Sequence, residues 1–219
     1  MNPPILSLKN VSYQTDQTKI LENISFDVQK GENITITGPS GSGKSTLLKM
    51  IGSLFTPTSG TIAYKGEQLE TIDPLTYRKA VSYFFQNASL FDETVKDNLA
   101  FPYEIRDQEI DESQIKTYLK QVELPTSYYD KPVNALSGGE KQRIALVRNL
   151  LFKPEVLLLD EITSALDAEN QEIILSLLNE RNQKDGVTIL KVTHDETEIA
   201  ESTRVIRIVK GRMEDSHGE

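Results

Sequence analysis

The chain has 219 residues, including 24 Lys and Arg, 33 Asp and Glu, two His and no Cys, and its formal net charge at pH 7 is −9. The acidic balance argues against a nucleic-acid-binding protein, and the lack of cysteine excludes disulfides, thiol catalysis and thiolate metal sites. The N-terminus has no signal-peptide pattern, and no apolar run approaches the ~20 residues of a membrane helix. We therefore expect a cytoplasmic protein with no membrane span of its own.

The predicted strands of the first part lie at residues 5–13, 24–28, 33–37, 60–64 and 81–84, with a helix at 44–53. Residues 94–152 are expected to be mainly helical, with apolar side chains at helical spacing in 111–122 and 137–152. From there, strands at 155–160, 187–193 and 204–209 alternate with helices at 168–180 and 195–201. This alternation favours an α/β fold with a mainly parallel sheet and a helical insertion.

The segment GPSGSGKST follows a predicted strand and opens a predicted helix, which is the context of a P-loop. Its backbone N–H groups and the helix N-terminus would surround phosphate oxygens. Lys44 would reach the β- and γ-phosphates, and the Ser45 hydroxyl would bind Mg²⁺. The nucleotide-binding residues expected here are Gly38, Pro39, Ser40, Gly41, Ser42, Gly43, Lys44, Ser45 and Thr46. A flexible turn before a helix is the alternative, and the agreement of strand, loop, lysine, hydroxyl and helix disfavours it.

The segment VLLLDE, residues 156–161, places two acids at the end of an apolar strand. Asp160 would lie where the P-loop Mg²⁺ binds, and Glu161 could activate a water against the γ-phosphate. The alternative is a buried strand that ends in two solvated acids, which the P-loop in the same chain disfavours. Together the two motifs predict hydrolysis of ATP or GTP.

A second glycine pair lies in LSGGEKQR, residues 136–143. Ser137 and Glu140 form a capping-box pattern that predicts a helix start. Gly138 and Gly139 are not needed for that cap, and each costs about 0.5–1 kcal/mol relative to alanine. They would let a phosphate approach the helix N-terminus closely. Because the P-loop already binds this chain's nucleotide, we expect the glycine pair to serve the nucleotide of another chain.

The LSGGE string, between the P-loop and LLLDE, resembles the signature motif of ABC ATPases, and further motifs of that family follow in order along the whole chain. The resemblance implies that Tyr13 stacks on adenine, that Gln86 belongs to a glutamine loop, that Ser164–Asp167 form a D-loop and that His194 is the switch histidine. Taken singly, Tyr13 could be a strand aromatic, Gln86 a surface residue and His194 a helix cap. Their order favours the family interpretation.

The resemblance implies a P-loop NTPase fold with a mainly parallel core sheet, an N-terminal antiparallel β subdomain and an inserted α-helical subdomain. One domain would span residues 1–219. The core and the β subdomain would occupy 1–86 and 153–219, and the helical subdomain 87–152.

It also implies a head-to-tail homodimer, in which each ATP lies between the P-loop of one copy and the signature of the other. The signature and D-loop residues expected to contact that nucleotide are Ser137, Gly138, Gly139 and Asp167. The expected catalytic residues are Lys44, Gln86, Glu161 (the general base) and His194. The expected Mg²⁺ ligands are Ser45, Gln86 and Asp160.

The stretch Asn87–Arg106 would receive a coupling helix of a membrane permease, as the corresponding region does in the family, although ordinary packing of the insertion is the alternative. The chain would then lie peripherally on the inner face of the cell membrane. No nucleic-acid partner is expected.

Spacers such as KILENISF, YRKAVSYFFQ and LFDETVKDNLAFPYEIR resemble the iron-export ATPases of the FetA type, a subgroup of the family. Ile162 stands where the family commonly has proline, and we expect activity to survive because no catalytic group is lost. The expected function is the ATPase subunit of an ABC transporter, with metal (iron) export implied by the subgroup. The alternatives are a transporter ATPase for a non-metal substrate, a soluble ABC-type ATPase of translation or DNA repair, and a non-catalytic dimerisation module.

Overall fold

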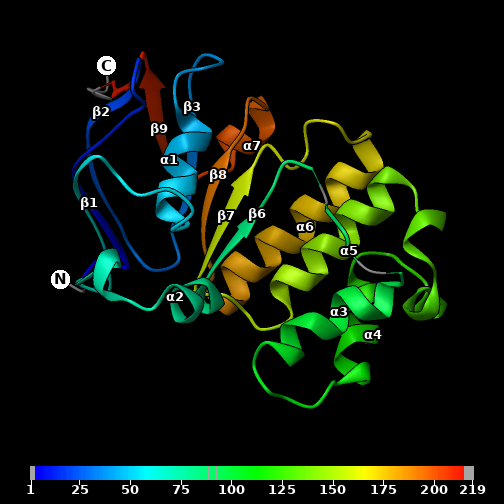
Figure 1. Cartoon of the computed structure of the whole chain (residues 1–219). Coiled ribbons are helices and arrows are strands. Elements are labelled where there is room, and N and C mark those ends of the chain that lie inside the picture. The colour runs from blue at the N-terminus through cyan, green and yellow to red at the C-terminus, as the bar shows by residue number, and fades with distance from the viewer. Residues whose placement is uncertain (1–2, 88, 92, 215–219) are drawn as a thin grey trace. The chain divides into compact units, whose positions relative to one another are not determined.

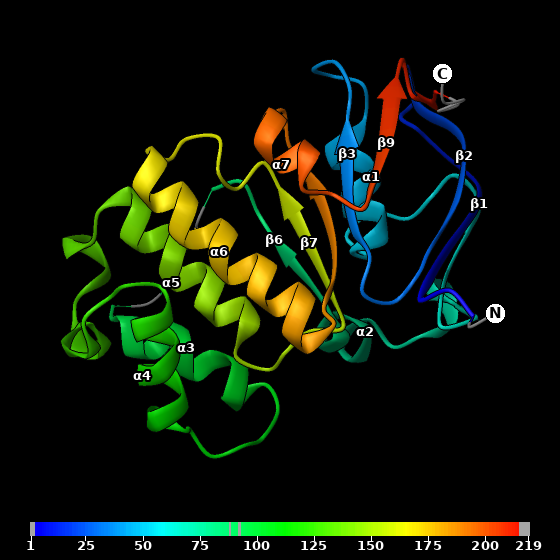
Figure 2. The same cartoon turned by 180° about the vertical axis from the view of Figure 1, so that it is seen from behind.

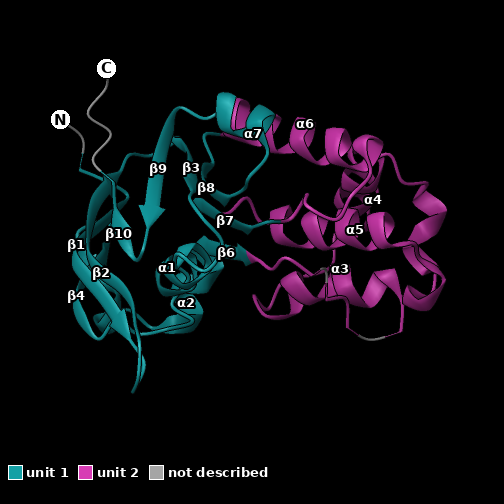
Figure 3. Ribbon diagram, turned by 90° about the horizontal axis from the view of Figure 1, so that it is seen from above, with its two compact units in different colours: residues 1–83, 155–161, 186–219 teal, residues 84–154, 162–185 magenta. Residues whose placement is uncertain are grey.

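The computed structural model describes residues 3–87, 89–91 and 93–214 (Figures 1 and 2). The chain forms two compact units (Figure 3): unit 1 comprises residues 1–83, 155–161 and 186–219, and unit 2 comprises 84–154 and 162–185. This partition assigns 162–185 to the helical unit, unlike the predicted subdomains. The organisation as a single domain over 1–219 stays a prediction, and its ends, 1–2 and 215–219, lie outside the described residues.

The first sheet of unit 1 is antiparallel and has the strand order β2-β1-β4-β5. Its strands are β1 (Leu6–Gln14), β2 (Lys19–Val28), β4 (Ser59–Tyr64) and β5 (Glu67–Gln68). From Asn23 to Val28 of β2, exposed side chains alternate with buried ones, as a strand with one face on a core requires. This sheet corresponds to the predicted antiparallel β subdomain.

The second sheet has the order β10-β9-β3-β8-β7-β6, and its β9–β3, β3–β8 and β8–β7 pairs are parallel. Its strands are β3 (Asn33–Thr37), β6 (Val81–Phe84), β7 (Val156–Asp160), β8 (Thr188–Val192), β9 (Arg204–Val209) and β10 (Arg212–Met213). Every residue of β7 and β8 is buried, which is typical of central parallel strands. The mainly parallel sheet was predicted from the alternation of strands and helices.

The helices of unit 1 are α1 (Lys44–Ile51), η1 (Leu69–Thr71), α2 (Pro74–Ala80) and α7 (Glu196–Ala200). Helix α1 contacts β7 and β8 and contributes to a hydrophobic core that both sheets share. Because β3, β7 and β8 run parallel, their carboxyl ends lie at one edge of the sheet. The loop that joins β3 to α1 starts at this edge, where α/β folds commonly bind ligands.

Unit 2 is helical. Its elements are α3 (Val95–Glu104), α4 (Glu112–Gln121), η2 (Thr126–Asp130), η3 (Val133–Ala135), α5 (Gly138–Leu150) and α6 (Ala168–Asp185). Helix α5 contacts α3, α4 and α6. It buries Ile144, Val147 and Leu150, which recur every three residues and so share one face. Helix α5 therefore forms the centre of this unit.

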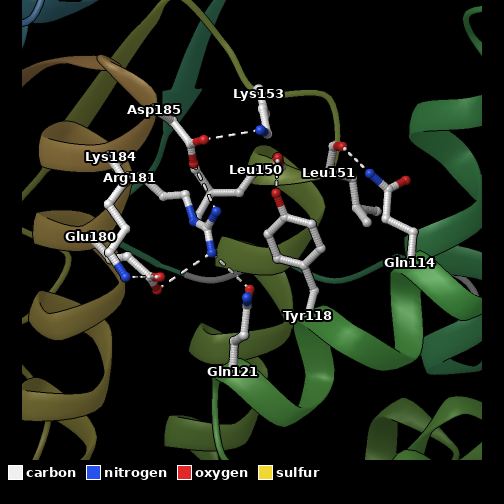
Figure 4. Close-up of polar contacts among 10 residues, drawn as sticks. All are labelled: Gln114, Tyr118, Gln121, Leu150, Leu151, Lys153, Glu180, Arg181, Lys184 and Asp185. Atoms are coloured by element: carbon white, nitrogen blue, oxygen red, sulfur yellow. Dashed lines mark hydrogen bonds and ion pairs between the residues drawn. The ribbon is translucent and has the colours of Figure 1, made fainter.

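Polar contacts join α4, α5 and α6 (Figure 4). Arg181 of α6 is 8% exposed and donates to Asp185 Oδ2 at 2.7 Å and to Gln121 Oε1 at 2.9 Å. Its guanidinium carbon lies 5.4 Å from the ring centroid of Tyr118, whose hydroxyl donates to the Leu150 carbonyl at 3.1 Å. These contacts hold the last turns of α6 against α4.

The predicted elements largely agree with the observed ones. The bounds of β3, β6 and β9 are those predicted, and the capping box at the start of α5 is present, with Ser137 Oγ accepting from Glu140 N–H at 3.2 Å. Helix α2 was not predicted, although Asp73 caps it and Pro74 opens it. None of the helices in the described part of the chain combines the length and apolar character needed to cross a membrane.

Candidate functional site

The P-loop connects β3 to α1. Gly38, Gly41 and Gly43 adopt φ angles of 136°, 75° and 101°, in the range that favours glycine. A Cβ on Gly38 would collide with the backbone of Ile208, and one on Gly43 would lie 2.7 Å from the Leu21 side chain. No atom lies within 4 Å of a Cβ added to Gly41. Two glycines are therefore required by neighbouring strands, while Gly41 leaves open space beside the loop.

The start of α1 is suited to an anion. Gly43 is its N-cap residue and provides no side-chain cap, so N–H groups of the first turn are available to a ligand. The Ser42 hydroxyl is buried and has no hydrogen-bond partner among the described residues. Pro39, Ser40 and Gly41 are exposed. A phosphate would supply acceptors for these donors, so the loop fits such a group.

Lys44 lies inside the P-loop. It is 5% exposed, and its Nζ donates to the carbonyls of Gly38 at 2.8 Å and Pro39 at 3.0 Å. Burial lowers the pKa of Lys44, and the charges of Glu161 and Asp160 oppose this shift. The ammonium group is therefore held by loop carbonyls and lies in the field of two carboxylates.

Asp160, the last residue of β7, accepts hydrogen bonds on both carboxylate oxygens. Ser45 Oγ donates to Oδ1 at 2.8 Å, and the Tyr83 hydroxyl donates to Oδ2 at 2.8 Å. Burial raises the pKa of Tyr83, and the charge of Asp160 adds to the effect. The predicted Mg²⁺ ligands Ser45 and Asp160 thus lie together, as hard oxygen donors that suit this ion.

Glu161 and His194 lie next to each other in unit 1. His194 Nε2 is 3.5 Å from Glu161 Oε1, and the two side chains are 52% and 27% exposed. Glu161 follows β7 with φ of 51°, and its N–H donates to the Val192 carbonyl at 3.0 Å. His194 precedes Asp195, which caps α7. A partly exposed carboxylate and an imidazole are therefore available at the edge of the sheet where the P-loop starts.

Tyr13 stacks on Phe55. Their ring centroids are 5.6 Å apart with an interplanar angle of 8°, and Lys49 Nζ is 5.7 Å from the centroid of Phe55. Tyr13 pairs with Leu21 across β1 and β2, and the Leu21 side chain borders Gly43 of the P-loop. The predicted adenine-stacking residue thus lies near the P-loop, with a second aromatic ring beside it.

The signature and D-loop residues lie in unit 2. Ser137 and Gly138 are exposed, and no atom lies within 4 Å of a Cβ added to Gly138. A Cβ added to Gly139 would lie 2.7 Å from Asn170 Nδ2 and closer still to Asn170 Oδ1. Asp167 is exposed and accepts from the backbone and side-chain N–H groups of Asn170. Gly139 and Asp167 thus both lie against the side chain of Asn170.

The other predicted residues of unit 2 follow β6. Gln86 is exposed, and within Asn87–Arg106 the residues Ala88 and Asp92 lie outside the described residues. Phe91 and Phe101 pack edge to face with centroids 5.0 Å apart, and both remain more than a third exposed. Part of the predicted docking stretch therefore presents an aromatic surface.

Tyr83, Phe55 and Asn170 were not identified as site residues from the sequence. Each contacts a predicted site residue: Asp160, Tyr13 and Asp167, respectively. Tyr83 lies in the predicted strand at residues 81–84, but periodicity does not reveal which side chain of another strand it contacts. Asn170 stands three residues after Asp167, a helix-start spacing that was a readable signal.

Comparison with known proteins finds that this chain is similar to ABC transporters. The family model described as "ABC transporter" matches residues 21–164. The "Probable iron export ATP-binding protein FetA" of Escherichia coli is 46% identical over 220 residues, covering 100% of this chain and 98% of that protein. The "Spermidine/putrescine import ATP-binding protein PotA" of Mycoplasma mycoides subsp. mycoides is 39% identical over 98% of this chain, which spans 61% of that longer protein.

Two solved structures resemble this chain with a TM-score of 0.85. One is a dimeric ATP-binding cassette in a post-hydrolysis state bound to ADP and Pi, with 32% identity over 95% of this chain and 96% of that one. The other is a bacterial Atm1-family ABC exporter with ATP bound, with 30% identity over 97% of this chain and 38% of that one. These likenesses confirm the predicted fold class, a P-loop NTPase with an antiparallel β part and a helical part.

Proposed function

Because the chain belongs to the ABC transporter family, as one of its ATP-hydrolysing subunits, we propose that two copies hydrolyse ATP at composite sites and drive a separate membrane permease. The observation that carries the proposal is the group of Lys44, Ser45, Asp160 and Glu161 at one edge of the parallel sheet. The reaction is ATP + H₂O → ADP + phosphate.

Nucleotide binding would use the P-loop. The uncapped N-terminus of α1 and the unpartnered Ser42 hydroxyl offer donors to phosphate oxygens. Lys44 would leave the carbonyls of Gly38 and Pro39 and donate to the β- and γ-phosphates. Tyr13 would present a ring face to adenine.

Mg²⁺, when bound, would neutralise charge that develops on the phosphate oxygens. Ser45 Oγ and Asp160 fit such an ion, because both are oxygen donors and already lie within 2.8 Å of each other. Binding of a cation would replace the hydrogen bond that Ser45 donates to Asp160. Gln86 of unit 2 is the third ligand that we propose.

Hydrolysis would use Glu161 as the general base. Its carboxylate is partly exposed, so it can meet a water molecule, and His194 Nε2 lies 3.5 Å away. The carboxylate would take a proton as the water oxygen attacks the γ-phosphate, and ADP would leave. His194 would hold the γ-phosphate and orient the water.

The composite site would form in a head-to-tail homodimer, with Ser137, Gly138, Gly139 and Asp167 of one copy facing the P-loop of the other. Three features support this proposal. The exposed N-terminus of α5 leaves Gly138 open, Asp167 is exposed, and a related cassette was solved as a dimer. ATP would favour the closed pair because both copies contact its phosphates, and hydrolysis would remove that preference.

The permease would dock near Asn87–Arg106, where Phe91 and Phe101 form an exposed aromatic pair. The chain would then lie on the cytoplasmic face of the cell membrane. We propose export of iron, or of a related metal, as the transported function, and similarity to FetA over the whole chain supports it.

The ATPase proposal is tested by comparing ATP turnover of the wild-type chain with that of Glu161→Gln. We expect the variant to lose at least about 100-fold in kcat while it still binds ATP and forms a stable dimer. Equal turnover in both chains would contradict the assigned base. Light scattering with Mg-ATP measures the dimer.

The transport proposal needs the partner. Co-purification of the chain with its membrane protein, followed by ATP-driven uptake of ⁵⁵Fe into inverted vesicles, would support iron export. Uptake of spermidine by right-side-out vesicles, without iron transport, would instead favour the function named for PotA.

A further inference from the structure

Asn170, in the first turn of α6, lies between two segments that the proposed function assigns to the partner's nucleotide. Its Nδ2 donates to both carboxylate oxygens of Asp167, at 2.8 and 2.9 Å. The same carboxamide packs against Gly139, in the first turn of α5, at the position that a side chain there would occupy. One residue therefore contacts both the signature and the D-loop of its own chain.

The contact with Gly139 is sterically tight. A Cβ at position 139 would lie 2.5 Å from Asn170 Cγ and 2.7 Å from Nδ2, distances that real Cβ atoms do not adopt. Since the obstacle is the end of a side chain, the structure would respond by moving the carboxamide. A side chain at position 139 would thus displace a neighbour within the chain, apart from any approach of a nucleotide.

The contact with Asp167 is what such a movement would break. Asn170 Oδ1 is buried and has no hydrogen-bond partner among the described residues, so the two bonds to Asp167 are what orient the carboxamide. The backbone N–H of Asn170 also donates to Asp167, at 2.9 Å, and would remain. A displaced carboxamide would therefore release the Asp167 side chain partly.

We propose that Asn170 is a positioning residue that couples the signature helix to the D-loop within each chain. Displacement at Gly139 moves the carboxamide of Asn170, and Asp167 follows. The inference rests on the proposed function, because the coupling matters only if both segments meet the nucleotide of the other copy. One further contact ties α5 to the segment before α6: Gln142 Nε2 donates to the Ile162 carbonyl at 2.8 Å.

The test is a double-mutant cycle on ATP-driven dimerisation in a Glu161→Gln background. Gly139→Ala and Asn170→Ala should each raise the ATP concentration for half-maximal dimer by about tenfold, because each removes the same bonds to a charged group. The double variant should be no weaker than the weaker single variant. Additive losses from the two substitutions would overturn the coupling.

Gly138→Ala is the matched control, because its Cβ would meet nothing within 4 Å in the chain. Its effect should add to that of Asn170→Ala, since the two changes share no partner. If Gly138→Ala and Asn170→Ala were as non-additive as Gly139→Ala and Asn170→Ala, the substitutions would be disrupting the helix start in general. That result would also overturn the proposal.

A second measurement does not need the dimer. The backbone and side-chain N–H groups of Asn170 hold the pKa of Asp167 below its usual value. NMR titration of Asp167 in the monomer should show the same upward shift of pKa in Gly139→Ala and in Asn170→Ala.

If Glu161→Gln failed to dimerise with ATP, the composite-site proposal would fail, whereas an unshifted pKa of Asp167 in Gly139→Ala would refute the coupling itself.

Discussion

The hydroxyl of Tyr83 donates to Oδ2 of Asp160 at 2.8 Å. Ser45 donates to the other oxygen of the same carboxylate, so donors from β6 and α1 orient Asp160 from two directions. The phenol of Tyr83 is protonated at physiological pH and can donate, and burial raises its pKa further above the ordinary value. The proposed metal ligand is thus held by its own chain before a ligand binds.

Tyr83→Phe should weaken the response to Mg²⁺. Loss of a hydrogen bond to a charged group should raise the Mg²⁺ concentration for half-maximal ATPase activity by about tenfold, with a smaller change in kcat. Tyr77→Phe is the control, since the Tyr77 hydroxyl donates to the Ile51 carbonyl at 2.6 Å, away from Asp160. An equal Mg²⁺ shift in both variants would show that the effect is not specific to Asp160.

Phe55→Ala should raise KM for ATP by about 2- to 10-fold and leave kcat unchanged, because an aromatic pair contributes about 0.5–1.5 kcal/mol. The reason is that Phe55 supports the ring of Tyr13, which we propose to stack on adenine. Steady-state kinetics of the purified chain measures this. Leu75→Ala removes another exposed apolar side chain of unit 1 and should leave KM unchanged. A fall in kcat at unchanged KM would contradict the role of Phe55.

The residues of the candidate site were predictable from the sequence where they stand close together in short motifs. The P-loop, the VLLLDE strand and the LSGGE start of α5 each have their residues within nine positions or fewer. The spacing of the P-loop indicates a phosphate site, and the other two motifs are interpreted from its presence in the same chain. Tyr83 and Asp160 are 77 residues apart. Their contact depends on strand order, which no local pattern encodes.

The fold was predictable to the level of its elements and class. The alternation after residue 155 indicates parallel strands, but it does not reveal that β3 lies between β9 and β8. The end of α6 was placed too early, at residue 180. Arg181 bonds to Gln121, which is 60 residues away, and this tertiary contact sustains the last turn beyond the local pattern.

Arg181→Met should destabilise the helical unit by about 2–4 kcal/mol, because it leaves Gln121 and Asp185 without their buried donor. Lys153 still pairs with Asp185 at 2.9 Å in the variant, so the loss of stability should be smaller than if Asp185 had no cation left beside it. Denaturant unfolding measures the change. Lys184→Ala is the control: it breaks a pair with Glu180 in which Lys184 is 74% exposed, and it should cost less than about 0.5 kcal/mol. Similar losses in both variants would contradict the buried network.

Lys191 and Glu198 form a buried pair between β8 and α7. Lys191 Nζ is 3.8 Å from Glu198 Oε2, and the two side chains are 5% and 4% exposed. Burial lowers the pKa of Lys191 from 10.5, and the nearby charges of Glu198, Glu201 and Asp195 oppose this shift. A pair that is buried, and too long for a good hydrogen bond, is expected to contribute little net stability.

The pair makes stability depend on pH with a defined sign. In the pH window between the lowered pKa of Lys191 and 10.5, the unfolded chain holds a proton that the folded chain has lost. The contribution of Lys191 to the free energy of unfolding therefore rises with pH through that window.

Substitution of both partners, Lys191→Met with Glu198→Leu, should abolish this contribution and leave the chain equally stable or more stable by about 1–4 kcal/mol at neutral pH. Lys191→Met alone should cost about 3–5 kcal/mol, since Glu198 would remain buried without its cation. Urea unfolding of the three chains from neutral pH up to about 10 separates these effects, because the wild-type curve minus that of the double variant isolates the pair. If that difference fell with increasing pH, the pKa of Lys191 would be raised rather than lowered, and the attraction of Glu198 would outweigh the burial of the ammonium group.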